Sequence, residues 1–185
     1  MSIDDGHATS PSANPDGVGT TGAVRHHLLS VLVENRPGVL TRVAGLFARR
    51  GYNIHSLAVA PTEDPAVSRI SMVVDVASSP LPQMMMQLDK LINVLEISEL
   101  SPAMAVEREV LLATVGAAAD ARAELDEALA GFDSRVLDSD DSAVTVSVLG
   151  TPEQIDDAEV LLAAFGLLAV QRSGRVALST LSAQD

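Results

Sequence analysis

The chain has 185 residues, of which 47% are apolar, so it can bury the core of one domain or of two small ones. Its formal net charge of −13 excludes a broad basic surface for nucleic-acid backbones. The lack of cysteine excludes disulfides, zinc–thiolate sites and a thiol nucleophile, and the scarcity of aromatic residues argues against base stacking.

The first 22 residues contain almost no apolar side chains, and we expect them to form a disordered tail. Within this tail, Gly17–Gly22 fits the G-x-G-x-x-G pattern of dinucleotide-binding turns. That pattern needs a strand before it and a helix after it, whereas here a polar tail precedes and a strand follows, so we interpret it as a linker. Neither a secretion signal nor a membrane span is recognisable in the sequence, and we expect a cytoplasmic protein.

Hydrophobic periodicity predicts two copies of the element order β-α-β-β-α-β. The expected fold is therefore α+β, with two ferredoxin-like domains in tandem, each a four-stranded antiparallel sheet with two helices on one face. The first copy is expected at His27–Val33, Gly38–Arg50, Asn53–Ala60, Val67–Val76, Leu81–Ile92 and Val94–Leu100. The second is expected at Glu109–Val115, Asp120–Leu129, Ser134–Asp138, Ala143–Leu149, Pro152–Phe165 and Leu167–Gln171, followed by a short strand, Arg175–Leu178.

We divide the chain into a tail (1–22), a first domain (23–100) and a second domain (101–185). The first domain carries seven acidic and seven basic residues, whereas the second carries fifteen acidic and five basic ones. The acidic faces of the second domain are either simply solvated or a docking surface for a basic patch on a partner.

The residues that commonly perform catalysis do not form an evident cluster, so we expect no catalytic residues and no metal site. His26 and His27 are neighbours on one strand and point to opposite faces, which prevents them from sharing an ion. The acidic segment Asp138–Ser142 lacks the glycine and the distal glutamate of a calcium loop, and it predicts a hairpin turn.

One junction between a strand and a helix has the composition of a small-molecule site. After Asn35, Pro37 and Gly38 allow a ligand to approach the backbone, and the free N–H groups at the start of the following helix favour a carboxylate. Asn53 begins the next strand, and a second subunit can bring such a strand end close to this junction. The alternative is structural: Asn35 caps the helix or closes a turn, and Asn53 adopts a left-handed conformation.

Several motifs along the chain resemble those of a known family. The segments 29–40 (LSVLVENRPGVL), 42–47 and 50–54 (RGYNI) are similar to an ACT domain. The segments 56–62, 87–94, 106–109 and 172–178 (RSGRVAL) resemble the small, regulatory subunits of acetolactate (acetohydroxyacid) synthase. His55 and Ala169 stand where that family commonly has acidic residues.

The resemblance implies a protein with no active site of its own that activates a catalytic subunit and confers feedback inhibition by valine or a related branched-chain amino acid. The thiamine diphosphate, Mg²⁺ and FAD of the reaction are expected in that large subunit, with no cofactor in this chain. The resemblance also implies a homodimer of ACT domains, with the second domain contacting the catalytic subunit. The effector is expected at positions matching Asn35, Gly38, Val39, Leu40, Asn53 and Ile54.

Other functions are also compatible with the residues. An ACT-type amino-acid sensor for a different biosynthetic enzyme would share the effector site but not the partner. A plain scaffold would dimerise without an effector, and a stand-alone enzyme would need a catalytic cluster that the sequence lacks.

Overall fold

The structure is a computed structural model and describes residues 25–76, 81–116 and 121–181. The predicted tail, with its glycine motif, lies outside these residues, as does the predicted helix start at Asp120. Within the described residues, no helix is long and apolar enough to cross a membrane.

The first unit is a four-stranded antiparallel sheet with the order β2-β3-β1-β4. Both helices pack on one face of it, against alternate strand residues such as Leu29, Val31 and Met72. Phe47 of the first helix is fully buried in this core, with Tyr52 at its edge. The elements are β1 (Arg25–Glu34), α1 (Val39–Arg50), β2 (Asn53–Pro61), β3 (Val67–Val76), α2 (Leu81–Asp89) and β4 (Val94–Leu100).

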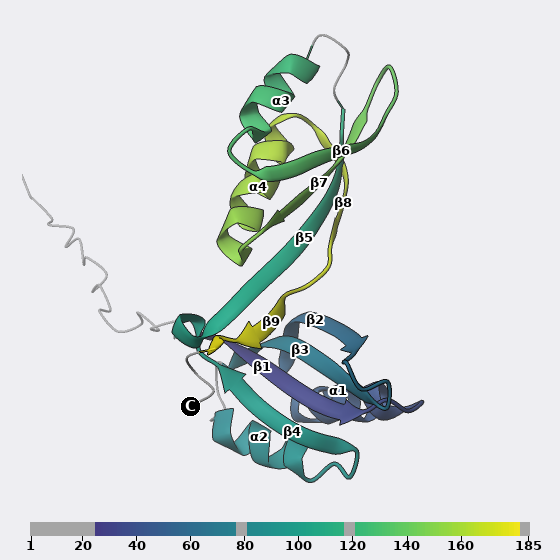
Figure 1. Cartoon of the computed structure of the whole chain (residues 1–185), viewed down its shortest axis with the longest axis vertical. Coiled ribbons are helices and arrows are strands. Elements are labelled where there is room, and N and C mark those ends of the chain that lie inside the picture. The colour runs from purple at the N-terminus through teal and green to yellow at the C-terminus, as the bar shows by residue number, and fades with distance from the viewer. Residues whose placement is uncertain (1–24, 77–80, 117–120, 182–185) are drawn as a thin grey trace, which may run out of the picture.

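The second unit repeats this topology, with the strand order β6-β7-β5-β8 and two helices over one face (Figure 1). Its core is aliphatic and includes Leu111, Val146, Ile155 and Leu162. After a short 3₁₀ turn (Pro102–Met104), the elements are β5 (Ala105–Val115), α3 (Arg122–Leu129), β6 (Asp133–Ser139), β7 (Val144–Gly150), α4 (Pro152–Ala164), β8 (Leu167–Arg172) and β9 (Val176–Ser179).

Strand β5 connects the two units, because it runs from the first sheet into the second (Figure 1). Its first four residues pair with β9, and its remainder pairs with β7 and β8. Ala177 of β9 packs with Leu28, Val73 and Leu100 on the face of the first sheet that the helices leave open. The last strand of the chain therefore covers part of the first unit.

The predicted fold class is confirmed, and the differences from the expected elements are local. The first helix begins at Val39 and not at Gly38, because Gly38 has a left-handed backbone that a helix cannot continue. The α2 helix ends at Asp89 instead of Ile92, and β5 begins four residues before the predicted Glu109 because β9 pairs with that extension. Asp138–Ser142 does form a hairpin turn, as predicted.

Candidate functional site

The junction between β1 and α1 leaves backbone donors free. Gly38 has φ 85° and ψ −8°, and no side chain caps the helix. Val39 N–H donates to the Arg36 carbonyl at 3.3 Å, but the N–H groups of Gly38 and Leu40 have no acceptor among the described residues. Two amides at the positive end of a helix are suited to a carboxylate.

Asn35 holds this junction against the loop between β2 and β3. Its side-chain amide donates to the Pro65 carbonyl at 2.9 Å, and its backbone N–H donates to the Ala66 carbonyl at 2.7 Å. Asn35 therefore does not cap α1, although capping was one of the structural alternatives. It positions the loop that precedes the free amides.

A polar chain that the sequence reasoning missed supports the same junction. Asn93 donates to the Glu34 carboxylate at 2.5 Å and accepts from the Arg42 guanidinium at 2.6 Å. Glu34 ends β1 and Arg42 lies in α1, so this chain connects both sides of the junction to the start of β4. The sequence separation of 51 to 59 residues explains why periodicity did not reveal it.

The other two predicted effector residues lie at the opposite end of the sheet. Asn53 begins β2 opposite Asp75, whereas Asn35 lies beside Ala66, just before β3 begins. The eight steps from Asn53 to Pro61 along β2 correspond to roughly 26 Å. One chain therefore brings Asn35, Gly38, Val39 and Leu40 together but leaves Asn53 and Ile54 apart from them. Leu40 is 42% exposed, whereas Val39 belongs to the core.

Asn53 is an extended strand residue and not a left-handed one, contrary to the structural alternative. Its side-chain amide donates to Asp75 Oδ2 at 2.5 Å. This bond is the main reason why the pKa of Asp75 lies below its ordinary value, with His26 adding to the effect. Ile54 points to the helix side of the sheet and packs at the edge of the core.

The expectation that the histidines do not form a cluster is wrong for two of them. His26 and His27 do point to opposite faces, with His26 beside Asp75 and His27 beside Glu99. However, the ring of His55 lies 4.8 Å from that of His26. The pairing of β1 and β2 with β3 brings His26 and His55 to the same side of Asp75, and the pairing of distant strands cannot be read from residue spacing within one strand.

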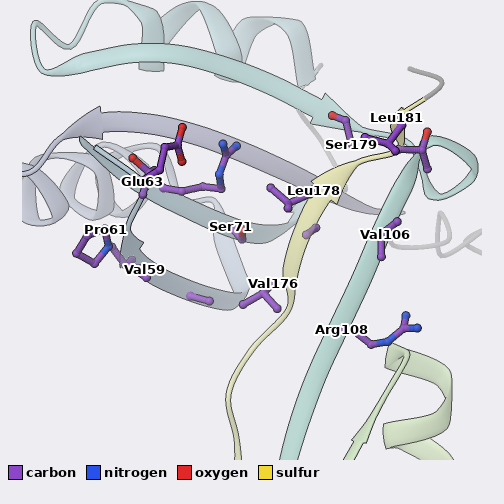
Figure 2. A pocket seen from close by; sticks show the side chains of 16 residues that line it. Val59, Pro61, Glu63, Ser71, Val106, Arg108, Val176, Leu178, Ser179 and Leu181 are labelled. Carbon is purple, nitrogen blue, oxygen red and sulfur yellow. The ribbon is translucent and has the colours of Figure 1, made fainter. Parts of the chain in front are cut away.

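An apolar groove of about 620 Å³ opens between the two units. Figure 2 shows Val59 and Pro61 of β2 on one side of it, with Val176 and Leu178 of β9 and Val106 of β5 on the other. None of the six predicted effector residues lines this groove. It forms because β9 returns over the first sheet, which the sequence reasoning did not foresee.

The units also touch next to the start of β2. Arg175 N–H donates to the Ser56 hydroxyl at 2.9 Å, and Gly174 passes so close that an added Cβ would lie 2.9 Å from that oxygen and 3.1 Å from the Leu57 carbonyl. Two residues earlier, Arg172 makes a two-pronged contact with Glu109, which is only 3% exposed. Glu109, followed by Asp156, raises the pKa of the Arg172 guanidinium.

Comparisons with known proteins bear on both units. The family model of the small-subunit-like ACT domain of acetohydroxyacid synthase (AHAS) matches residues 29–96, and the model named for the small subunit of acetolactate synthase matches residues 108–180. The acetolactate synthase small subunit of Mycolicibacterium smegmatis is 44% identical over 153 residues, which cover 83% of this chain and 90% of the relative. The chain belongs to the acetolactate synthase small-subunit family.

Further members support this assignment. The probable small subunit of Methanothermobacter thermautotrophicus is 40% identical over 154 residues, covering 83% of this chain and 92% of that protein. The crystal structure of the small subunit from Thermotoga maritima superposes with a TM-score of 0.77 at 31% identity, covering 84% of this chain and 98% of that one. The family resemblance and the ACT fold of the first unit are thus confirmed.

Proposed function

We propose that this chain binds the catalytic subunit of acetolactate synthase, raises its activity and makes it sensitive to valine or a related branched-chain amino acid. Membership of the small-subunit family over both units carries the partner assignment. Thiamine diphosphate, Mg²⁺ and FAD would reside in the catalytic subunit, and the complex of the two subunits would act in the cytoplasm.

The effector would bind between the ACT units of two chains. The β1–α1 junction offers free amides for a carboxylate, and Asn53 offers a polar group at the far end of the sheet. Strand β2 is an edge of the first sheet, and its outer side has no strand partner among the residues that the structure describes. Antiparallel pairing of two β2 edges would bring Asn53 of one copy beside Pro61 of the other, next to the loop that Asn35 holds.

The contact between Ser56 and the 174–175 segment supports a route from this site to the second unit. Ser56 lies three residues after Asn53 in β2, and Arg175 lies three residues after Arg172, the centre of the ion network. An effector that favours one placement of β2 would therefore bias the position of β8 and β9. Allostery of this kind requires a difference in affinity between two states, typically ~1–3 kcal/mol of coupling.

The second unit would provide the contact with the catalytic subunit. Its excess of acidic residues fits a basic surface on that partner better than a nucleic acid. The family model that matches this unit is named for the small subunit of acetolactate synthase. This match supports that synthase as the partner over a different biosynthetic enzyme.

The first experiment compares the substitutions Gly38→Asp and Gly51→Asp in the complex with the catalytic subunit. Both glycines have left-handed backbones, at φ 85° and 70°, and a Cβ at either one meets nothing within 4 Å, so the two variants carry similar strain. The Gly38→Asp side chain would place a negative charge where the effector carboxylate is expected. We expect Gly38→Asp to keep activation and to weaken valine binding by about tenfold or more, whereas Gly51→Asp keeps both responses.

The measurements are co-purification, acetolactate formation with and without valine, and calorimetry with valine, leucine and isoleucine. Asn53→Ala should also reduce the affinity for valine. If Gly38→Asp remains as sensitive to valine as Gly51→Asp, the effector site is wrong. If the chain neither co-purifies with the catalytic subunit nor changes its activity, the proposed partner is wrong.

A further inference from the structure

Three side chains that the proposed function does not use converge at one end of the first sheet. His26 of β1 lies directly opposite Asp75 of β3, and His55 of β2 lies next to both, at the bulge that follows Ile54. One ligand atom from each residue lies within 4.8 Å of the other two. We propose that His26, His55 and Asp75 form a binding site for a divalent transition-metal ion of the zinc type.

The donor set determines which metals the site would prefer. Two imidazole nitrogens and one carboxylate oxygen are a common three-ligand set for Zn²⁺, with water in the fourth position. Other first-row dications with an affinity for imidazole, such as Ni²⁺ and Cu²⁺, would compete. Mg²⁺ and Ca²⁺ prefer oxygen ligands, so the site would discriminate against them.

Only small movements of the three side chains are needed for their ligand atoms to surround an ion. Two donors at about 2.0–2.1 Å from a tetrahedral ion lie about 3.3 Å apart. His26 Nδ1 and Asp75 Oδ1 are 2.7 Å apart and would separate slightly, while His55 would approach by rotating its exposed ring. The side chain of His26 is 44% exposed, which leaves it room to adjust and leaves a path for the ion.

The surroundings of Asp75 are those of a metal-binding carboxylate. Its Oδ2 accepts a hydrogen bond from Asn53, which fixes the orientation of the carboxylate. Its Oδ1 is buried and lies 2.7 Å from His26 Nδ1, on the side of the histidines. An outer partner such as Asn53 holds a metal-binding carboxylate in a fixed orientation.

An ordinary ion pair explains less of this geometry. His26 and Asp75 would suffice for an ion pair, and His55 would then have no role beside them. The metal site gives all three side chains a role. The inference does not depend on the proposed function, because it concerns only groups within one chain.

The test is calorimetry with zinc chloride on the full-length, tag-free and metal-free chain, without the catalytic subunit. We expect one ion per chain in the wild type. We expect His26→Gln and His55→Gln each to lower the affinity about tenfold or more, and Asn53→Ala to lower it about 10- to 100-fold through the orientation of Asp75. Excess Mg²⁺ should not displace the zinc.

His27→Gln is the matched control, because His27 lies on the same strand but faces the other side of the sheet, beside Glu99. It should keep the affinity of the wild type. With Co²⁺ as a probe, the visible absorption of a tetrahedral site should be present in the wild type and in His27→Gln and absent in His55→Gln. Equal zinc affinity in the wild type and the His26→Gln/His55→Gln double variant would overturn the proposal, as would an equal loss in His27→Gln.

Discussion

Helices α1 and α4 both begin where a strand ends, yet their first turns are completed in different ways. The Thr151 hydroxyl accepts from Gln154 N–H, and the Gln154 side-chain oxygen accepts from Thr151 N–H. Pro152 has no backbone N–H that would need an acceptor, so α4 is capped by its own residues. Helix α1 starts after the left-handed Gly38 with no side-chain cap.

The two helices also differ in how they are held to their sheets. Asp156 and Glu159 of α4 bind Arg172, which in turn pairs with the buried Glu109. The guanidinium of Arg42 in α1 donates an exposed hydrogen bond to the Asn93 side chain. The comparison teaches that the start of α4 satisfies its own polar groups, while the start of α1 leaves donors available for something outside the chain.

The largest effect should come from removing the arginine that holds α4. Arg172→Met would leave the buried carboxylate of Glu109 without a partner, and we expect a loss of about 3–5 kcal/mol in the free energy of unfolding, measured by denaturant titration. Arg42→Met in α1 is the control and should cost about 1 kcal/mol or less, since its contacts are exposed. Similar losses for the two variants would contradict the difference between the units.

An intermediate effect is expected from the capping box itself. Thr151→Ala should lower the free energy of unfolding by about 1 kcal/mol, because the N–H of Gln154 loses its acceptor. Thr41→Ala in the first turn of α1 removes a hydroxyl that bonds to no described residue and should change stability by less than about 0.5 kcal/mol. Thermal unfolding of both variants measures the difference, and an equal loss would contradict the difference between the two helix starts.

The smallest effect concerns the turn between β6 and β7, where the second unit again satisfies its own amides. Asp140 Oδ1 accepts from Ser142 N–H, the Ser142 hydroxyl and Ala143 N–H, and these bonds, led by the one from Ser142 N–H, lower the pKa of Asp140 below 3.8. The stabilisation that the ionised Asp140 carboxylate provides is complete above pH 3.8, the ordinary pKa of an aspartate. It is lost as the pH falls through the lowered pKa.

NMR spectra recorded from about pH 5 to about pH 2 should therefore show the amide protons of Ser142 and Ala143 shifting with a midpoint below 3.8. The Asp140→Ala variant should lack this transition. A midpoint above 3.8 in the wild type would contradict the assigned hydrogen bonds.

Much of the fold could be predicted because the relevant signals are local. Alternation along β1 and the apolar stripe of α1 each depend on residues within one or two turns of chain. Element ends were less predictable: Gly38 ends the turn instead of starting the helix, and β5 extends because a distant strand pairs with it.

The candidate effector residues were also reached from sequence, since Asn35, Pro37 and Gly38 are adjacent and their chemistry is readable. The arrangement around them was not. Asn35 holds the Pro65 carbonyl, and Glu34, Asn93 and Arg42 form a chain across three elements. Such contacts follow from the packing of helices on the sheet, which residue spacing does not encode.

The sequence by itself determined two repeated βαββαβ units and the contrast in charge between the units, because each depends on residues close in the chain or on composition. Only the tertiary structure decided that Asn53 lies a sheet's length from Asn35, that β9 covers the first unit, and that His26, His55 and Asp75 converge. Those outcomes depend on strand register, a bulge and the return of the last strand, which join distant residues such as Ser56 and Arg175, 119 positions apart.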